Sequence, residues 1–412
     1  TSGYEPKVVL IPINGKTKKI GVQICEDLWD KDYSCKVSSE QQKMGAELII
    51  NISASPFREN KIEERKVLVA SKAKKIGLPF VYCNIIGAQD ELIFDGSSFA
   101  VSKEGILLAQ AKSFNEEIQI IDLNLSKRIK YLPTSREQDI FNALCLGVKD
   151  YFYKTNHEKA IIGLSGGIDS ALVAAIAVNA LGNENVYGFS LPSKFSSEHS
   201  LSDAKELASN LGIEYQVIKI HSLVSSFNNA LKPNAKNQRS DIAKENIQSR
   251  VRGNLLMGLA NMYGWLVLST GNKTEIALGY CTLYGDMIGA LSVIADLSKC
   301  DVYKLSNWIN KNIHNCIPVN SIIKPPSAEL SLNQVDPYDY SVVSPIVDDI
   351  IEKHKPPSVL INEGFEKELV YEIYNKIKKS EYKRRQAPLG LRVTSKAFGI
   401  GRRYPIVNNY NA

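Results

Sequence analysis

The sequence has 412 residues and carries 50 Lys and Arg against 44 Asp and Glu, a net charge of +6. This length allows two or three domains with sizeable cores. The charge is too weak to indicate nucleic acid, the seven cysteines contain no CxxC pair that would indicate zinc, and no apolar run is long enough to span a membrane. Since no signal peptide opens the chain, we expect a cytoplasmic protein with reduced thiols.

The first 125 residues alternate short β-branched runs with a single amphipathic helix. Strands are predicted at 8–13 and 19–24, around a tight turn at Asn14-Gly15. A helix is predicted over 62–76, with glutamates early and lysines late. This pattern is typical of layered α/β structure. Further strands are expected at 46–52, 78–86, 97–101 and 118–123.

Cys25 directly follows the strand predicted at 19–24, so the chain leaves that strand sharply and would project the thiol from its end. A cysteine in this position is either a small buried hydrophobic residue or a nucleophile. The local pattern alone leaves both interpretations open.

The stretch 159–182 contains a strand, a glycine turn and an Ala-rich helix in immediate succession. Gly166-Gly167 let backbone N–H groups approach a phosphate, and the helix N-terminus adds partial positive charge. Ser170 offers a hydroxyl donor, and Asp169 a carboxylate for a Mg²⁺ ion that bridges phosphates. No Gly-Lys-Ser/Thr follows, which excludes the Walker-type loop. The alternative is a Gly-Gly turn that only packs the strand on the helix.

The region after this turn continues the alternation of strands and helices. A strand at 186–191, a helix at 200–211 and a strand at 214–220 complete a βαβαβ pattern. This predicts a parallel, doubly wound sheet that binds ligands at the carboxyl ends of its strands. Lys194 follows one such strand end and is a candidate phosphate contact, although an exposed loop lysine is the more common case.

Later segments also place polar residues where ligands could bind. The helix predicted at 242–263 carries Asn246 beside its buried stripe, and the strand ending before Thr270 leads into a turn that contains Glu275. Residues 376–403 contain ten Lys or Arg and one acidic residue, which is either a solvated face or an electrostatic partner for phosphates.

The motif SGGIDS at 165–170 resembles the pyrophosphate loop of the N-type ATP pyrophosphatases, which cleave ATP between its α- and β-phosphates to adenylate a substrate. Together with TGNKTE at 270–275, KPPSAEL at 324–330 and EYKRRQAP at 381–388, it is similar to the NAD synthetases. The resemblance implies ATP contacts from Gly163, Leu164, Ser165, Gly166, Gly167, Ile168, Asp169, Ser170, Lys194 and Thr270. It implies Mg²⁺ at Asp169 and Glu275, and deamido-NAD contacts from Asn246, Glu275, Asp286, Lys299 and Lys383.

The N-terminal region resembles the nitrilase superfamily, and most of all the glutamine amidase domain of glutamine-dependent NAD synthetases, in GVQICEDLW at 21–29, NISASPF at 51–57 and NIIG at 84–87. The resemblance implies that Cys25 attacks the side-chain amide of glutamine and that Ser55 and Lys61 contact this substrate. In that family the catalytic glutamate and lysine precede the cysteine, and only 24 residues precede Cys25 here. We therefore expect a partial amidase domain that is not a glutaminase by itself.

Taken together, these features predict an α/β chain with two domains. Residues 1–125 are expected to form part of an α/β/β/α nitrilase-like layer domain, 126–135 a linker, and 136–412 a doubly wound parallel-sheet NAD synthetase domain. The predicted reaction is ATP-dependent amidation of deamido-NAD to NAD through an adenylated nicotinate, which releases AMP and pyrophosphate. The nitrogen is expected to come from ammonia, or from glutamine if the amidase is complete.

Three other interpretations are weaker. The first is another N-type ATP pyrophosphatase that amidates a different carboxylate or carbonyl substrate; the motifs at 270–275 and 324–330 argue against it. The second is a hydrolase that uses Cys25, and the third is a catalytically silent nucleotide-binding subunit. The resemblance also implies at least a homodimer, with neither a nucleic-acid nor a membrane partner.

Overall fold

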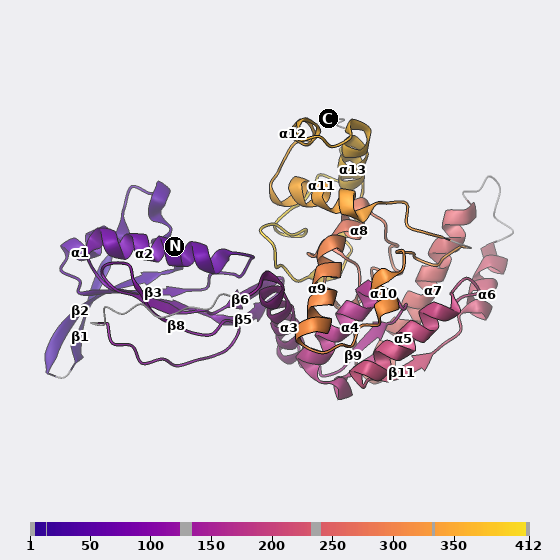
Figure 1. The fold of residues 1–412 in the computed structure, drawn as a ribbon, viewed down its shortest axis with the longest axis horizontal. Helices are drawn as coiled ribbons and strands as arrows, with labels where there is room; N and C mark the ends of the chain where they lie inside the picture. The colour runs from indigo at the N-terminus through magenta and orange to yellow at the C-terminus, as the bar shows by residue number, and fades with distance from the viewer. Residues whose placement is uncertain (1–4, 14, 124–133, 232–239, 332–333, 409–412) are drawn as a thin grey trace. The chain divides into compact units, whose positions relative to one another are not determined.

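The computed structural model describes residues 5–13, 15–123, 134–231, 240–331 and 334–408. The chain forms two compact units, Thr1–Ala143 and Leu144–Ala412, each with its own six-stranded sheet (Figure 1). Of the linker predicted at 126–135, residues 126–133 lie outside the described residues. Within the described part of the chain, no helix has both the length and the apolar character needed to cross a bilayer.

The first unit is a mixed sheet with helices on one face. Strands β2 to β4 are parallel, and the strands on either side of them pair antiparallel. Helices α1 (Val37–Lys43) and α2 (Lys61–Ile76) cover the face on which Ile49 and Phe80 are buried. The strand order is β1 (Lys7–Ile13), β2 (Lys16–Ile24), β3 (Leu48–Ser53), β4 (Phe80–Asn84), β7 (Phe99–Val101) and β8 (Leu107–Gln110), while β5 (Ile86–Gln89) and β6 (Leu92–Asp95) pair separately.

The structure of this unit differs from the sequence predictions at one predicted strand, and it contains strands β6 and β8 and helix α1, which were not predicted. The strand predicted at 118–123 is wrong, since these residues pair with no described strand and Ile118 is 97% exposed. Its apolar alternation is that of a strand, but no neighbouring strand offers it hydrogen-bond partners. Helix α1 was not predicted, because its sequence VSSEQQK lacks the apolar spacing of an amphipathic helix.

The second unit has the predicted doubly wound parallel sheet, and every neighbouring pair of strands is parallel. After β9 the chain adds β10 and then β11 on one side of β9, and it later adds β12 on the opposite side of β9. The strand order therefore reverses between β9 and β12. The order is β11 (Glu214–Val217), β10 (Val186–Ser190), β9 (Ala160–Gly163), β12 (Leu266–Ser269), β13 (Leu291–Ser292) and β14 (Leu389–Gly390).

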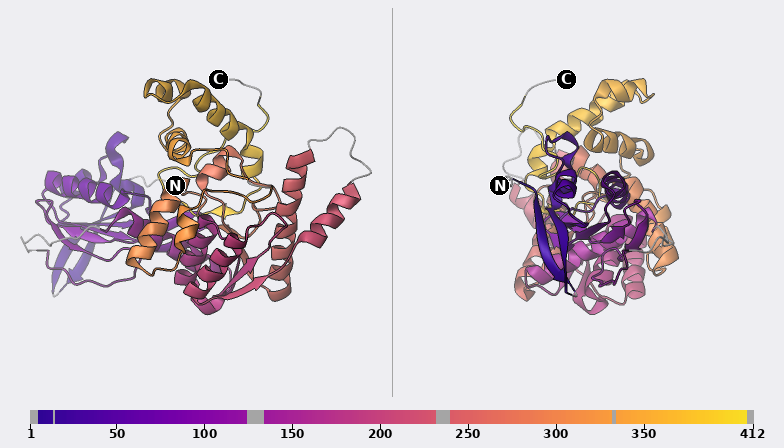
Figure 2. Two further views of the ribbon diagram at one scale, coloured as in Figure 1. Left: turned by 45° about the vertical axis from the view of Figure 1, so that its right-hand side comes forward. Right: turned by 90° about the vertical axis from the view of Figure 1, so that its left-hand side faces the viewer.

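Helices connect these strands and build a second core at the C-terminal end. A cluster of buried apolar residues joins α8 to α11 and α13, in the orange and yellow part of Figures 1 and 2. The helices are α3 (Arg136–Lys154), α4 (Ile168–Leu181), α5 (Glu198–Leu211), α6 (His221–Leu231), α7 (Ser240–Tyr263), α8 (Lys273–Leu278), α9 (Lys299–Asn312), α10 (Val319–Ile323), α11 (Tyr340–Glu352), α12 (Pro357–Asn362), α13 (Lys367–Lys379) and α14 (Glu381–Arg384).

We predict that Arg65→Met strongly destabilises the first unit. The Arg65 side chain is fully buried and bonds both carboxylate oxygens of Asp95 at 2.7 and 2.8 Å. Its loss would leave a buried, unpaired carboxylate, which costs about 3–5 kcal/mol. Arg58→Met is the matched control, because Arg58 and Glu64 are 28% and 42% exposed and such pairs contribute about 0.2–1 kcal/mol. Urea unfolding of both variants tests this, and equal losses would contradict it.

Candidate active site

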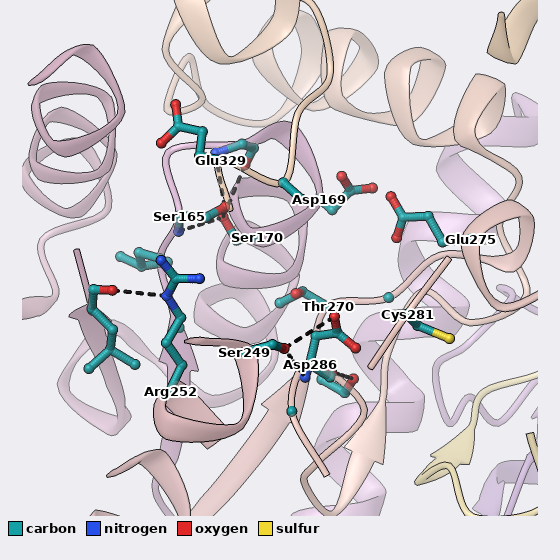
Figure 3. A pocket seen from close by; sticks show the side chains of 18 of the residues that line it. Ser165, Asp169, Ser170, Ser249, Arg252, Thr270, Glu275, Cys281, Asp286 and Glu329 are labelled. Atoms are coloured by element: carbon teal, nitrogen blue, oxygen red, sulfur yellow. Dashed lines mark hydrogen bonds between the residues drawn. The ribbon is translucent and has the colours of Figure 1, made fainter. Parts of the chain in front are cut away.

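A pocket in the second unit lies at the carboxyl ends of β9, β10 and β12, next to the point where the strand order reverses (Figure 3). The loop after β9, the end of β12, the turn before Ile288 and the segment 324–330 all contribute to its wall. The predicted ligand residues that line it are Gly163, Leu164, Ser165, Gly167, Ile168, Asp169, Ser170, Thr270, Glu275, Asp286 and Lys299.

The glycine turn after β9 is held in shape by two serine hydroxyls. Ser165 Oγ accepts the Gly167 N–H at 3.2 Å, and Ser170 Oγ donates to the Gly167 carbonyl at 3.0 Å. Gly166 has a φ of +77°, and a Cβ on it would lie 2.3 Å from the backbone oxygen of Ser200. No side chain caps the N-terminus of α4, an arrangement that favours binding of an anion at this turn.

Two carboxylates and a lysine form the charged centre of the pocket. Lys299 Nζ lies 2.5 Å from Asp169 Oδ2 and 3.3 Å from Glu275 Oε1, and Figure 3 shows the two carboxyl groups facing one another. Burial raises the pKa of Glu275 to about 7, although the Lys299 ammonium acts to lower it. Burial would lower the pKa of Lys299, but the two carboxylates outweigh this effect and raise it.

Asn272 connects the two carboxylates. Its Nδ2 donates to Asp169 Oδ1 at 2.9 Å, and its Oδ1 accepts the Glu275 N–H at 3.0 Å. In return, the Asn272 N–H donates to Glu275 Oε2 at 3.4 Å, which completes a capping box at the start of α8. Sequence analysis missed this residue, although the spacing Asn-x-x-Glu is the signal by which a capping box can be found.

Asp286 and Asn246 shape the turn that closes the pocket behind β12. Asp286 is buried, and its carboxylate accepts the Thr282 N–H at 2.7 Å and the Ser249 hydroxyl at 3.4 Å. Burial raises its pKa to about 6, against the lowering effect of the Thr282 hydrogen bond. Asn246 accepts the Thr282 hydroxyl at 2.8 Å, so both predicted substrate residues make bonds that fix this turn.

The segment 324–330 forms another wall of the pocket. The sequence analysis identified this segment only as a family motif and named no ligand residue in it. Glu329 Oε1 accepts hydrogen bonds from the hydroxyls of Ser197 and Ser200, at 2.9 and 2.7 Å, at the N-terminus of α5. Lys324 donates to Asp203 Oδ2 at 3.1 Å on the same helix. The segment is therefore held against α5 by both of its charged residues.

In the first unit, the predicted amidase residues lie at one edge of the sheet. Cys25 follows β2 and Ser55 follows the parallel neighbour β3, so both come from carboxyl ends of adjacent strands. Cys25 has a φ of +41°, a strained conformation that occurs at functional turns more often than elsewhere. Lys61 Nζ lies 3.9 Å from the centre of the Trp29 ring, four residues beyond Cys25.

Comparison with known proteins identifies both units. A family model described as NAD synthase matches residues 140–387, and one described as carbon-nitrogen hydrolase matches residues 2–131. The glutamine-dependent NAD(+) synthetase of Synechocystis sp. is 46% identical, over 96% of this chain and 74% of that protein. That of Thermotoga maritima is 39% identical, over 99% of this chain and 77% of that protein.

This chain belongs to the glutamine-dependent NAD(+) synthetase family. The solved structure of the Acinetobacter baumannii family member, in complex with ADP, superimposes with a TM-score of 0.73 at 37% identity and covers 100% of this chain and 76% of that one. The family assignment confirms the resemblance and the α/β fold class predicted from the sequence.

Four residues that family resemblance assigned to ligands do not line the synthetase pocket. Gly166 allows the turn through its positive φ and packs against the Ser200 backbone, and Asn246 accepts a hydrogen bond from Thr282. Lys194 is exposed and lies 4.8 Å from the Phe195 ring centre. Lys383 donates to the backbone carbonyls of residues 279 and 281, at 2.7 and 2.6 Å, and so supports the chain after α8.

We predict that Gly166→Ala weakens ATP binding by roughly tenfold or more, because the loop must shift to relieve a contact with backbone and to accommodate a left-handed residue. Gly258→Ala on α7 is the control, since nothing lies within 4 Å of its Cβ position. It should leave ATP affinity unchanged and stability the same or higher. Isothermal titration calorimetry measures the ATP affinity of both variants. Wild-type affinity in Gly166→Ala would show that ATP binding does not need this conformation of the turn.

Proposed function

We propose that this chain converts deamido-NAD to NAD with ATP. A carboxylate oxygen of the nicotinate attacks the α-phosphorus of ATP, the bond to the bridging β-phosphate oxygen breaks, and pyrophosphate leaves. Ammonia then attacks the acyl carbon of the adenylate, loses a proton and displaces AMP. The supporting observation is the pocket itself, in which the glycine turn and the uncapped N-terminus of α4 face the Asp169–Lys299–Glu275 centre.

We also propose that Asp169 and Glu275 hold the Mg²⁺ of this reaction. Two carboxylates together with phosphate oxygens are a donor set that Mg²⁺ uses with nucleotides. Among the described residues, no group of three or more His, Cys, Asp or Glu could hold a metal alone, so phosphate oxygens would complete the coordination. Bound there, Mg²⁺ would neutralise charge that develops on the leaving pyrophosphate.

For the nitrogen source we propose ammonia, or glutamine hydrolysed by the Cys25 thiol where the amidase domain is complete. The support is the strained backbone of Cys25 and its position after β2, at the same end of the sheet as Ser55 after β3. The cytoplasm is the proposed compartment, because it supplies ATP and keeps thiols reduced, and the cysteines of the described residues are all free.

The test is NAD formation from deamido-NAD and ATP with Mg²⁺, with ammonium or glutamine as nitrogen source. We expect product with ammonium, and Glu275→Gln should lower kcat by roughly 10²-fold because the charge that faces the phosphates is lost. Cys25→Ala should reduce any glutamine-dependent rate far more than the ammonium-dependent rate. Absence of NAD with both sources, in a chain that binds ATP, would refute the proposed reaction.

We further propose that the chain is a homodimer that buries the outer face of α6. Leu223, Phe227 and Leu231 are spaced four residues apart, so they share one face of the helix, and each is at least 40% exposed. α6 packs beside α7, as Figures 1 and 2 show from two sides. An apolar helical face of this kind suits self-association with a symmetry-related copy.

We predict that Phe227→Glu converts the dimer to a monomer, because a buried carboxylate without a partner is strongly unfavourable at an interface. Asn229→Glu is the control, since it adds the same charge two positions along the helix and therefore on another face. Sedimentation velocity at micromolar concentration distinguishes the species. A monomeric wild-type chain, or equal behaviour of the two variants, would contradict the proposal.

A further inference from the structure

Lys299 lies where a cation between the two pocket carboxylates would lie. It is the first residue of α9, its side chain is only 3% exposed, and its ammonium bonds Asp169 and Glu275 at 2.5 and 3.3 Å. The centre of the Tyr340 ring lies 5.4 Å from the ammonium. The lysine is therefore enclosed with its two anions and is not a surface group that happens to lie nearby.

The carboxylates are arranged around this ammonium. Each has one oxygen bonded to Asn272 and its other oxygen directed to Lys299, which closes a ring of four residues. The oxygens that face Lys299 are consequently the two that remain for any other cation. A divalent ion in the same gap would be repelled by the ammonium at short range and in a largely buried place, where charge repulsion is poorly screened.

We propose that Lys299 is an internal counterion that blocks the carboxylate pair until nucleotide phosphates bind, so that the divalent cation and ATP enter the site together. This inference rests on the proposed function, which supplies ATP as the ligand. The lysine lines the same pocket as the glycine turn, and the phosphates provide an alternative set of anions for its ammonium. When the Lys299 ammonium bonds the phosphates in place of Asp169 and Glu275, these two carboxylates become free for the divalent cation. The cation and ATP therefore increase each other's affinity.

The experiment measures binding of Mn²⁺, a paramagnetic substitute for Mg²⁺, from the electron paramagnetic resonance signal of the free ion. Wild-type chain should bind Mn²⁺ weakly alone and at least about tenfold more tightly with α,β-methylene-ATP, which cannot be cleaved at the proposed bond. Lys299→Met should bind Mn²⁺ without nucleotide at least about tenfold more tightly than wild type. The double variant Lys299→Met, Asp169→Asn should lose this gain.

Two further variants control for charge and folding. Lys304→Met removes an exposed lysine from the same helix and should leave Mn²⁺ affinity unchanged. Lys299→Arg retains the positive charge and should keep nucleotide-free Mn²⁺ binding weak, and circular dichroism verifies that each variant is folded. Tight Mn²⁺ binding by wild type alone, or no gain in folded Lys299→Met, would overturn the inference. If the ATP analogue does not bind wild type, the proposed function fails, whereas the nucleotide-free comparison still decides the role of Lys299.

Discussion

The active site depends on the hydrogen bonds of one buried amide. Asn272 is fully buried, and its side chain joins the first turn of α4, through Asp169, to the first turn of α8, through the Glu275 N–H; these helices follow the loops after β9 and β12. These two loops flank the point where the strand order reverses, which is where open parallel sheets leave a crevice. The amide therefore sets the separation of the two carboxylates, and with it the gap that Lys299 occupies.

Lys273, the residue after Asn272, holds α8 in place through buried ion pairs. Lys273 is 1% exposed and pairs with Asp296, Asp348 and Glu352, at 3.4, 3.2 and 2.7 Å. The acids belong to the turn after β13 and to α11, and Asp296 also accepts the Thr394 hydroxyl from the C-terminal segment. A buried cation that is surrounded by anions is costly to disturb, so α8 and its capping box are held rigidly. The pocket thus combines a fixed inner wall with outer walls made of loops.

Two of the four predicted ligand residues that lie outside the pocket lining share one property. Lys383 and Asn246 carry side chains that suit a phosphate or a dinucleotide, but the same groups bond carbonyls and hydroxyls of the protein equally well. Residue type and motif therefore predicted most of the pocket lining, but not which of these side chains bond to the protein itself. Glu329 and Lys324 were missed for the complementary reason, because each acts through bonds to α5 that its own surroundings in the sequence do not reveal.

By itself the sequence determined what depends on neighbouring residues: the glycine turn between strand and helix, the alternation of strands and helices after it, the hairpin near the N-terminus and the motifs that carry the family. These follow from backbone conformation and from apolar spacing over a few residues. Only the tertiary structure decided which charges meet. Asp169 lies 103 positions from Asn272 and 130 from Lys299, and no local pattern specifies those partners. They meet because the sheet returns to β12 beside β9, and burial then requires each charge to be paired.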